Sequence, residues 1–372
     1  MKLSSFHQFS AFHLFVLGWL LLLPGCGDSN SQSSENQSSL LSSDPSDGNV
    51  SSIPDTSQIH SDYTMMYASY YSGSCDGSGG IALDAKHFAV VNDETSLLLI
   101  YQRNEPGAPV QSINLRKALE LKKREEADLE GLARMGNYLF VLGSHSRDRE
   151  GNKQKERRKL LALRILSGEG GFDLKPVGDV YEDLMDDLED QDAFEDLDLK
   201  KSAKESGDDP EGFNIEGLCA GEDGVLWLCF RGPRIRNRAL LIPIINPEDV
   251  MVGARARFGK HLLLDLQGRT IRGADYFEGQ IVLVTDSDLD GLGPALFLWD
   301  GKSEEATLLH TPELRSIDPE SVILFPNTGL QELLILSDDG GRRLSGKDCK
   351  DLKNESEKRF RTITYQWRSP QR

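Results

Sequence analysis

The chain has 372 residues and a formal charge of −18, which is enough length for one large domain or two ordinary ones. The surplus of acidic residues argues against a general nucleic-acid-binding protein, because such a protein needs a basic surface. The acid is unevenly spread, since residues 181–211 hold fourteen Asp or Glu and only three Lys.

The N-terminus has the features of an export signal. Lys2 supplies the positive charge, and the apolar segment "FHLFVLGWLLLL" is too short for a comfortable membrane span. The following "LPGC" places Gly25 directly before Cys26 and resembles a bacterial lipoprotein signal. We therefore expect residues 1–25 to be removed and Cys26 to carry lipid. An ordinary signal peptide and an uncleaved anchor are the alternatives.

Residues 26–62 are rich in Ser, Asn, Asp and Gln and contain few large apolar side chains. Such a segment cannot bury enough surface to offset the entropy of ordering it, which predicts a disordered tether ahead of a folded domain at 63–372. The expected location is the bacterial cell envelope, with the membrane contacted through the lipid. The residue after Cys26 is not Asp, which favours the outer membrane if the host is Gram-negative.

Five stretches of the folded part share one plan: a polar or glycine marker, an apolar run, a turn, and a second apolar run that ends in polar residues. They are "SGGIALDAKHFAVVNDE" (78–94), "DLEGLARMGNYLFVLGSHSR" (128–147), "IEGLCAGEDGVLWLCFR" (215–231), "IRGADYFEGQIVLVTDSD" (271–288) and "PESVILFPNTGLQELLILSDDG" (319–340). The markers are Gly79, Glu130, Glu216, Arg272 and Glu320, with spacings of 51, 86, 56 and 48. Without the acidic stretch the period is near 50, which is typical of propellers and repeat arrays.

Each unit contains a hairpin and, in most cases, two further apolar runs, which makes four strands. This layout predicts an all-β fold, a β-propeller of five four-stranded blades, with six blades as the main competitor. A β-sandwich is a further alternative, which the roughly constant period disfavours. The last unit lacks a fourth strand, and "YTMMYASYY" (63–71) belongs to no unit. We expect this N-terminal strand to complete the last blade and close the ring.

The acidic stretch 181–211 interrupts the second unit. Tyr181, Leu184, Met185 and Leu188 have the i, i+3, i+4, i+7 spacing of one helical face. We interpret the stretch as a helical insertion that leaves blade two and packs on the rim. A solvated acidic loop is the alternative.

The segments "DLEGLAR…GSHSR", "FNIEGLCAGEDG…FRGP", "LDLQGRTIRGADY", "DPESVILFP" and "LLILSDDG" resemble the bacterial family known as domain of unknown function 3616. The similarity spans roughly residues 70–366. The resemblance implies a propeller that is distantly similar to phytase-like and esterase-like propellers, whose better-studied members use calcium to hydrolyse phosphate esters. The family name itself carries no activity.

In a propeller, the start of each blade's first strand and the end of its second strand meet at the same mouth of the channel. The starts carry the four charged markers. The ends carry Asp93, Glu94, Ser144, His145, Arg147, Arg231, Asp286, Asp338 and Asp339. We therefore predict a ligand-binding site at the channel mouth made by Glu130, Glu216, Arg231, Arg272, Glu320 and His145. The alternative is that these charges only lock neighbouring blades together by compensating one another.

A cation is suggested by "DSDLDG" (286–291), which matches the first half of a calcium loop. Asp286, Asp288 and Asp290 would be the metal ligands. The match then fails, because the twelfth position is Phe297 rather than a bidentate acid. An Asp-rich hairpin turn is the alternative.

The sequence leaves two classes of function open. It contains no G-x-S-x-G nucleophile elbow, no paired-His zinc motif and no P-loop, so whether it is an enzyme is uncertain. The first hypothesis is an envelope-anchored propeller that binds an unidentified small molecule or protein. The second is a calcium-assisted phosphoesterase, because paired carboxylates can hold cations that polarise a phosphoryl group.

Four cysteines remain besides Cys26. Cys219 and Cys229 lie on one hairpin, where a tight turn at 222–223 would place Cys219 opposite Leu226, so they are interpreted as buried free thiols. The first and last blades are neighbours in a closed ring, so Cys75 and Cys349 can approach. A disulfide between these two is expected, with two unpaired thiols as the alternative.

Overall fold

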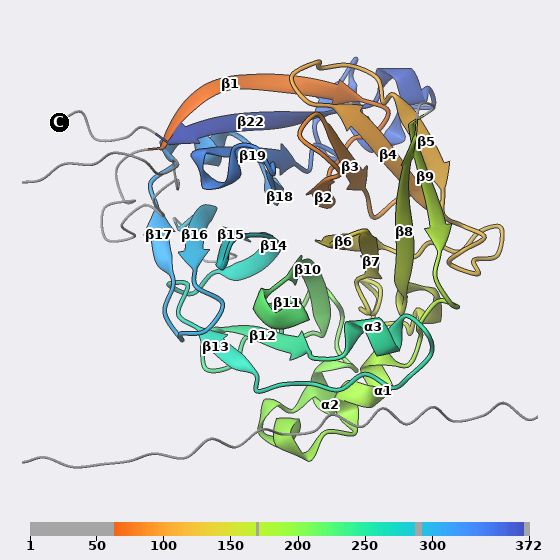
Figure 1. Ribbon diagram of the computed structural model, residues 1–372, viewed down its shortest axis with the longest axis vertical. Coiled ribbons are helices and arrows are strands. Elements are labelled where there is room, and N and C mark those ends of the chain that lie inside the picture. The colour runs from red at the N-terminus through yellow and green to blue at the C-terminus, as the bar shows by residue number, and fades with distance from the viewer. Residues whose placement is uncertain (1–62, 169–170, 287–291, 368–372) are drawn as a thin grey trace, which may run out of the picture. The chain divides into compact units, whose positions relative to one another are not determined.

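The computed structural model describes residues 63–168, 171–286 and 292–367, all within one compact unit, Pro54–Arg372. These residues form a five-bladed β-propeller whose blades surround a central channel (Figure 1). The predicted all-β propeller with five blades is confirmed. The predicted signal, Cys26 and the tether lie outside the described residues.

Each blade is an antiparallel sheet of four strands. Blade one contains β2 (Gly79–Ala82), β3 (His87–Val91), β4 (Leu97–Gln102) and β5 (Gln111–Asn114). Blade two contains β6 (Leu129–Met135), β7 (Tyr138–Gly143), β8 (Leu160–Gly168) and β9 (Gly171–Pro176). Blade three contains β10 (Asn214–Ala220), β11 (Leu226–Gly232), β12 (Ala239–Ile244) and β13 (Leu262–Leu264). Blade four contains β14 (Thr270–Phe277), β15 (Gln280–Asp286), β16 (Ala295–Trp299) and β17 (Thr307–Leu309).

Blade five joins the two ends of the domain. It contains β18 (Pro319–Leu324), β19 (Glu332–Ser337), β22 (Arg359–Trp367) and the N-terminal strand β1 (Tyr63–Ser72). β1 is the outer strand and pairs with β22 from Tyr63 opposite Trp367 to Ser72 opposite Arg359. The expected ring closure by residues 63–71 is therefore found.

The hydrophobic core is divided into layers between adjacent blades. Five large clusters of buried side chains each combine residues of two neighbouring blades, including the pair formed by blades five and one. Both faces of a blade are therefore covered. This is why the middle strands are continuous apolar runs, such as "ALLIPI" in β12, rather than alternating ones.

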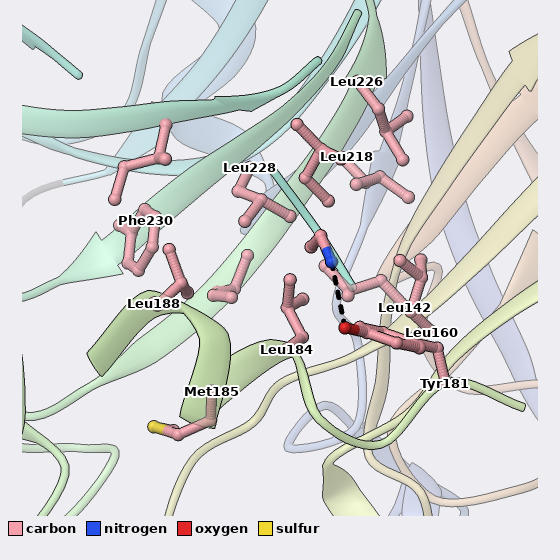
Figure 2. Close-up of a cluster of buried hydrophobic side chains, with 14 of the residues drawn as sticks. Leu142, Leu160, Tyr181, Leu184, Met185, Leu188, Leu218, Leu226, Leu228 and Phe230 are labelled. Atoms are coloured by element: carbon pink, nitrogen blue, oxygen red, sulfur yellow. Dashed lines mark hydrogen bonds between the residues drawn. The ribbon is translucent and has the colours of Figure 1, made fainter. Parts of the chain in front are cut away.

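The acidic insertion forms two short α-helices, α1 (Leu184–Glu189) and α2 (Leu199–Ser202), joined by a 3-10 helix, η3 (Asp192–Leu197). Figure 2 shows the predicted apolar face against side chains of blades two and three. Leu184, Met185 and Leu188 are at most 1% exposed. Tyr181 is not helical, because its backbone pairs with Leu160, and its hydroxyl accepts from the Ala256 amide at 3.0 Å.

The remaining regular elements are short and lie in the connections. They are η2 (Lys155–Arg157), η4 (Glu222–Gly224), α3 (Pro247–Val250), η5 (Pro312–Ser316), η6 (Gly329–Gln331), β20 (Arg343–Leu344), β21 (Lys347–Asp348), η7 (Cys349–Asp351) and η8 (Glu355–Glu357). No helix in the described part of the chain is long and apolar enough to cross a membrane.

The structure places Cys75 and Cys349 in a disulfide with a Cα–Cα distance of 5.7 Å, and leaves Cys219 and Cys229 free and buried. Cys219 faces Trp227 rather than the expected Leu226. The turn is one residue longer than expected, because the Gly221 amide donates to the Val225 carbonyl and encloses η4.

Candidate functional site

A β-bulge carries the marker residue in four of the five blades. Where the first strand pairs with the second, the register skips Glu130, Glu216, Arg272 and Glu320. In blade one this position is Gly79, which pairs with Val91 without a bulge. A bulge re-aims the side chain of its extra residue, and all four charged markers line one cavity at the channel mouth.

The glycine after three of the markers has a packing role. A Cβ added at Gly273 would lie 2.3 Å from the Glu320 carbonyl oxygen, and one at Gly131 would lie 2.7 Å from the Leu218 Cβ. Both contacts are to the first strand of the next blade. The Glu-Gly and Arg-Gly pairs therefore combine a bulge that presents a charge with a small residue that lets neighbouring inner strands approach closely.

The channel-mouth cavity has a volume of about 370 Å³ and receives side chains from all five blades. Among the described residues, its lining holds eleven Asp or Glu and six Arg or Lys. The acids are Asp93, Glu94, Glu126, Asp128, Glu130, Asp148, Glu150, Asp208, Glu216, Glu320 and Asp338, and the bases are Arg147, Arg149, Arg157, Arg231, Arg272 and Lys350. The cavity therefore has an excess of negative charge.

Arg272 connects three blades. Its Nη1 lies 3.0 Å from Glu216 Oε2, and its Nε donates to Glu320 Oε2 at 3.0 Å while its Nη2 pairs with the other Glu320 oxygen. Arg231 also donates to Glu216, at 3.0 Å. Both glutamates are at most 5% exposed. This half of the marker ring thus has the mutual compensation that buried charges require.

On the other side of the cavity Arg157 pairs with Asp128 at 2.8 Å, but two further acids lack such compensation. No side chain in the described ranges makes a hydrogen bond or ion pair with Glu130 or Asp93. Burial, followed by repulsion from Glu216, raises the pKa of Glu130 well above its usual range. Burial, followed by repulsion from Asp128, raises the pKa of Asp93 to about 7. The negative charge of Glu130 and Asp93 is therefore limited by protonation rather than by pairing with cationic side chains.

Burial also raises the pKa of Glu320 to about 8, and the Arg272 guanidinium opposes the rise. A single guanidinium faces two carboxylates here, and further acids lie close by. The shared guanidinium therefore does not fully offset the effect of burial on Glu320.

Five of the six predicted ligand-binding residues, Glu130, Glu216, Arg231, Arg272 and Glu320, line the cavity together. His145 does not. It is 2% exposed, its Nδ1 lies 2.8 Å from the Gly143 carbonyl oxygen, and burial lowers the pKa of its ring to about 4. The backbone at His145 has a φ of 60°, so the chain leaves the extended path here and the ring is turned away from the row of mouth side chains.

The predicted calcium ligands are not part of the cavity as described. Asp286 ends β15 opposite Thr270 and is absent from the cavity lining. Asp288 and Asp290 lie outside the described residues. Within the described ranges no group of three or more His, Cys, Asp or Glu side chains is arranged to hold a metal ion.

Asp128 and Asp208 are among the cavity residues that the sequence interpretation missed. Asp128 lies two residues before the marker Glu130 and pairs with Arg157, 2.8 Å away. Its only signal was the acid in "DLEG", and the same spacing in "DPES" places Asp318 outside the cavity lining. Asp208 comes from the end of the insertion and lies 3.0 Å from Arg149 and 3.8 Å from Arg231. Only the packing of the insertion brings it there, so no local motif identifies it.

The fold and the site define a class: a five-bladed β-propeller with an acid-rich channel mouth built from bulged inner strands. Residues 78–167, which span blade one and most of blade two, match the family described as "Protein of unknown function (DUF3616)". The resemblance expected from the sequence is confirmed over this segment. No curated protein matches the chain.

Solved structures of similar shape are distant. The allergen Mala s 1 of Malassezia sympodialis is 9% identical with a TM-score of 0.40, covering 79% of this chain and 93% of that one. A putative oxidoreductase (glucose dehydrogenase) from Thermus thermophilus is 13% identical with a TM-score of 0.38, covering 80% and 99%. YCF48 bound to D1 peptide is 12% identical with a TM-score of 0.30, covering 76% and 66%. These likenesses carry no conclusion about what this chain binds.

Proposed function

We propose that the protein is a lipid-anchored envelope protein whose propeller binds a small cationic ligand at the channel mouth. The observation that carries the proposal is the pair of cavity acids, Glu130 and Asp93, that no cationic side chain in the described ranges neutralises. A carboxylate in such a place costs free energy unless a proton or a cation compensates it. A bound cation supplies that compensation.

The ligand class follows from the charge and size of the cavity. Eleven acids against six bases disfavour an anion, and about 370 Å³ accommodates only a small molecule or a hydrated ion. Cation binding must displace a proton from Asp93, because burial raises the pKa of this carboxyl to about 7. Affinity is therefore expected to rise between pH 6 and pH 8, with release of protons on binding.

Replacing Glu130 by glutamine tests the proposal. Ca²⁺, Mg²⁺ and the diamine putrescine are the probes, measured by titration calorimetry at pH 6 and pH 8. We expect at least one probe to bind more tightly at pH 8, and the Glu130→Gln variant to bind it about tenfold or more weakly, since a charged hydrogen-bonding partner is lost.

Glu222→Gln is the matched control, because Glu222 lies exposed in the turn between β10 and β11 and pairs with Lys302. It should bind the probes like the unaltered protein. Failure of all three probes to bind, or equal binding by Glu130→Gln, would overturn the cationic ligand. Turnover of a generic phosphate ester in the presence of Ca²⁺ would favour the phosphoesterase instead.

The anchor is tested separately. Its support is the "LPGC" sequence, in which Gly25 precedes Cys26. The unaltered protein should fractionate with membranes and have Cys26 as its lipidated N-terminus. Cys26→Ser should carry no lipid, which mass spectrometry of the N-terminal peptide shows directly. An unmodified Cys26 in the membrane fraction would mean that the lipoprotein signal was misread.

A further inference from the structure

The outer edge of blade five exposes large side chains that elsewhere in the fold are mostly covered. On β1, Met66 is 51% exposed, Tyr67 is 41% exposed and Tyr70 is 43% exposed. β1 is an edge strand, since β22 is its sole partner within the described sheets. We call these three side chains, together with Arg342 and Arg359, the blade-five edge.

Two arginines flank the most accessible part of this edge. The guanidinium carbons of Arg342 and Arg359 lie 5.2 Å and 5.5 Å from the centroid of the Tyr70 ring. Arg342 Nη2 also donates to the Tyr70 hydroxyl at 3.4 Å. An amphipathic ring flanked by guanidinium groups is the combination found where proteins meet the headgroup region of a membrane.

The surroundings of the edge are basic in an otherwise acidic chain. Residues 342–361 hold eight Lys or Arg against four Asp or Glu, a net charge of +4, whereas the whole chain carries −18. The acidic insertion packs on blades two and three, which are the blades furthest from blade five in a five-membered ring (Figure 1). The basic segment 342–361 of blade five and the acidic insertion therefore lie on opposite sides of the ring.

The length of chain before β1 indicates that the blade-five edge contacts a membrane. β1 is the first strand of the domain, and the 37 residues from Cys26 to Asp62 precede it. Even fully extended, that many residues reach only about 130 Å, so a lipid on Cys26 keeps β1 close to the membrane. The tether raises the effective concentration of lipid near β1, so a small patch of side chains is sufficient to hold the domain against the membrane.

We propose that the blade-five edge rests on an anionic lipid surface and turns the acidic insertion on blades two and three away from it. The proposal rests on the lipid anchor of the proposed function. An anionic surface attracts the basic segment 342–361 and repels the acidic insertion, so both interactions orient the domain in the same direction. The insertion and the remaining cavity-lining segments of blades two and three then face away from the lipid.

The test uses the full-length lipidated protein in vesicles of phosphatidylcholine, with or without about 30% phosphatidylglycerol as the anionic lipid. A fluorophore is attached to Met66→Cys, or to Val252→Cys as the control. Val252 is 69% exposed and follows α3 on blade three. The native cysteines of the propeller do not compete for the label, because Cys219 and Cys229 are buried and the other two form the disulfide.

Quenching by brominated lipid reports proximity to the bilayer. On phosphatidylglycerol vesicles we expect the Met66→Cys label to be quenched at least about twofold more than the Val252→Cys label, and the excess to vanish in about 0.5 M salt. The double substitution of Arg359→Glu in the edge and Arg343→Glu in the basic segment 342–361 should abolish the excess as well, and both positions are exposed. The measurement at high salt uses no arginine variant. It therefore tests the electrostatic contact even if the double variant folds poorly.

Each outcome separates the edge from the anchor. If the protein stays on the vesicles and the two labels are quenched equally, the proposed contact of the blade-five edge is wrong and the lipid anchor is supported. Retention on anionic vesicles alone, with selective quenching at Met66→Cys, supports the edge and contradicts the anchor. Loss of the protein from both kinds of vesicle overturns both. A label at Met66→Cys that is shielded in a dimer would show that a second copy occupies the edge, which also overturns the proposal.

Discussion

Replacing Arg272 by methionine should lower the free energy of unfolding by about 3–5 kcal/mol, because removal of one member of a buried charge network leaves its partners uncompensated. The guanidinium is shared by Glu216 and Glu320, which belong to blades three and five. Methionine retains much of the apolar stem, so the loss reports the charge rather than the volume. Urea unfolding of the two proteins at one pH measures the difference.

The loss should be larger at about pH 9 than at about pH 7. Burial already raises the pKa of Glu320 to about 8, and loss of the guanidinium raises it further. A carboxyl with a raised folded-state pKa holds a proton in the folded protein that the unfolded chain has released. Each protein therefore loses stability as the pH rises from about 4.5 towards its own folded-state pKa, and the two curves separate only above about pH 8. At about pH 7 the carboxyl is largely protonated in both folded proteins, so the difference is smaller.

Two further variants show whether the effect of Arg272→Met is specific to the buried charge network. Arg257→Met is the control, because Arg257 is 67% exposed and pairs with an Asp249 that is 60% exposed, so it should change stability by at most about 0.5 kcal/mol. Adding Glu320→Gln to Arg272→Met should recover part of the loss at about pH 9, because it removes a carboxyl whose ionisation no guanidinium compensates. A near-neutral Arg272→Met would show that solvent screens the network.

The fold was predictable because its signals are local and repeated. A period near 50 and hydrophobic runs of strand length depend only on neighbouring residues, and a closed ring then determines which strand completes blade five. The convergence of Glu130, Glu216, Arg272 and Glu320 followed from propeller geometry alone. Each lies at the start of a first strand, and all such starts meet at one mouth of the channel.

The details of the site depended on contacts that no local pattern records. The bulges at the markers arise where inner strands of adjacent blades nearly touch, as at Gly273 and Glu320. His145 was misplaced because a single left-handed residue redirects its side chain. Asp208 reaches the cavity through the apolar packing of the insertion some twenty residues earlier. Which acids lack a cationic partner, the basis of the proposed function, could be seen only with all five blades in place.

The second large effect concerns the disulfide. The paired substitution Cys75→Ser and Cys349→Ser should lower the free energy of unfolding by about 3–5 kcal/mol. The bridge closes a loop of 274 residues, for which the chain-entropy relation gives an upper value of about 5.6 kcal/mol that strain reduces. β1 and β22 still pair without it, so the folded ring should persist and the change should arise mainly in the unfolded chain. Chemical denaturation with and without reductant measures it.

Reduction of the unaltered protein should reproduce the variant, and reductant should leave the variant unchanged, which separates the bridge from the effect of serine in a buried place. The bridge also holds the segment that carries Lys350 beside Asp338, two residues of the channel-mouth cavity. The Asp339 amide donates to the Cys75 carbonyl at 2.9 Å, so the cavity wall is fastened next to the disulfide. Cation affinity should therefore fall together with stability. Equal stability in the presence and absence of reductant would mean that the pairing of β1 with β22 alone secures the closure.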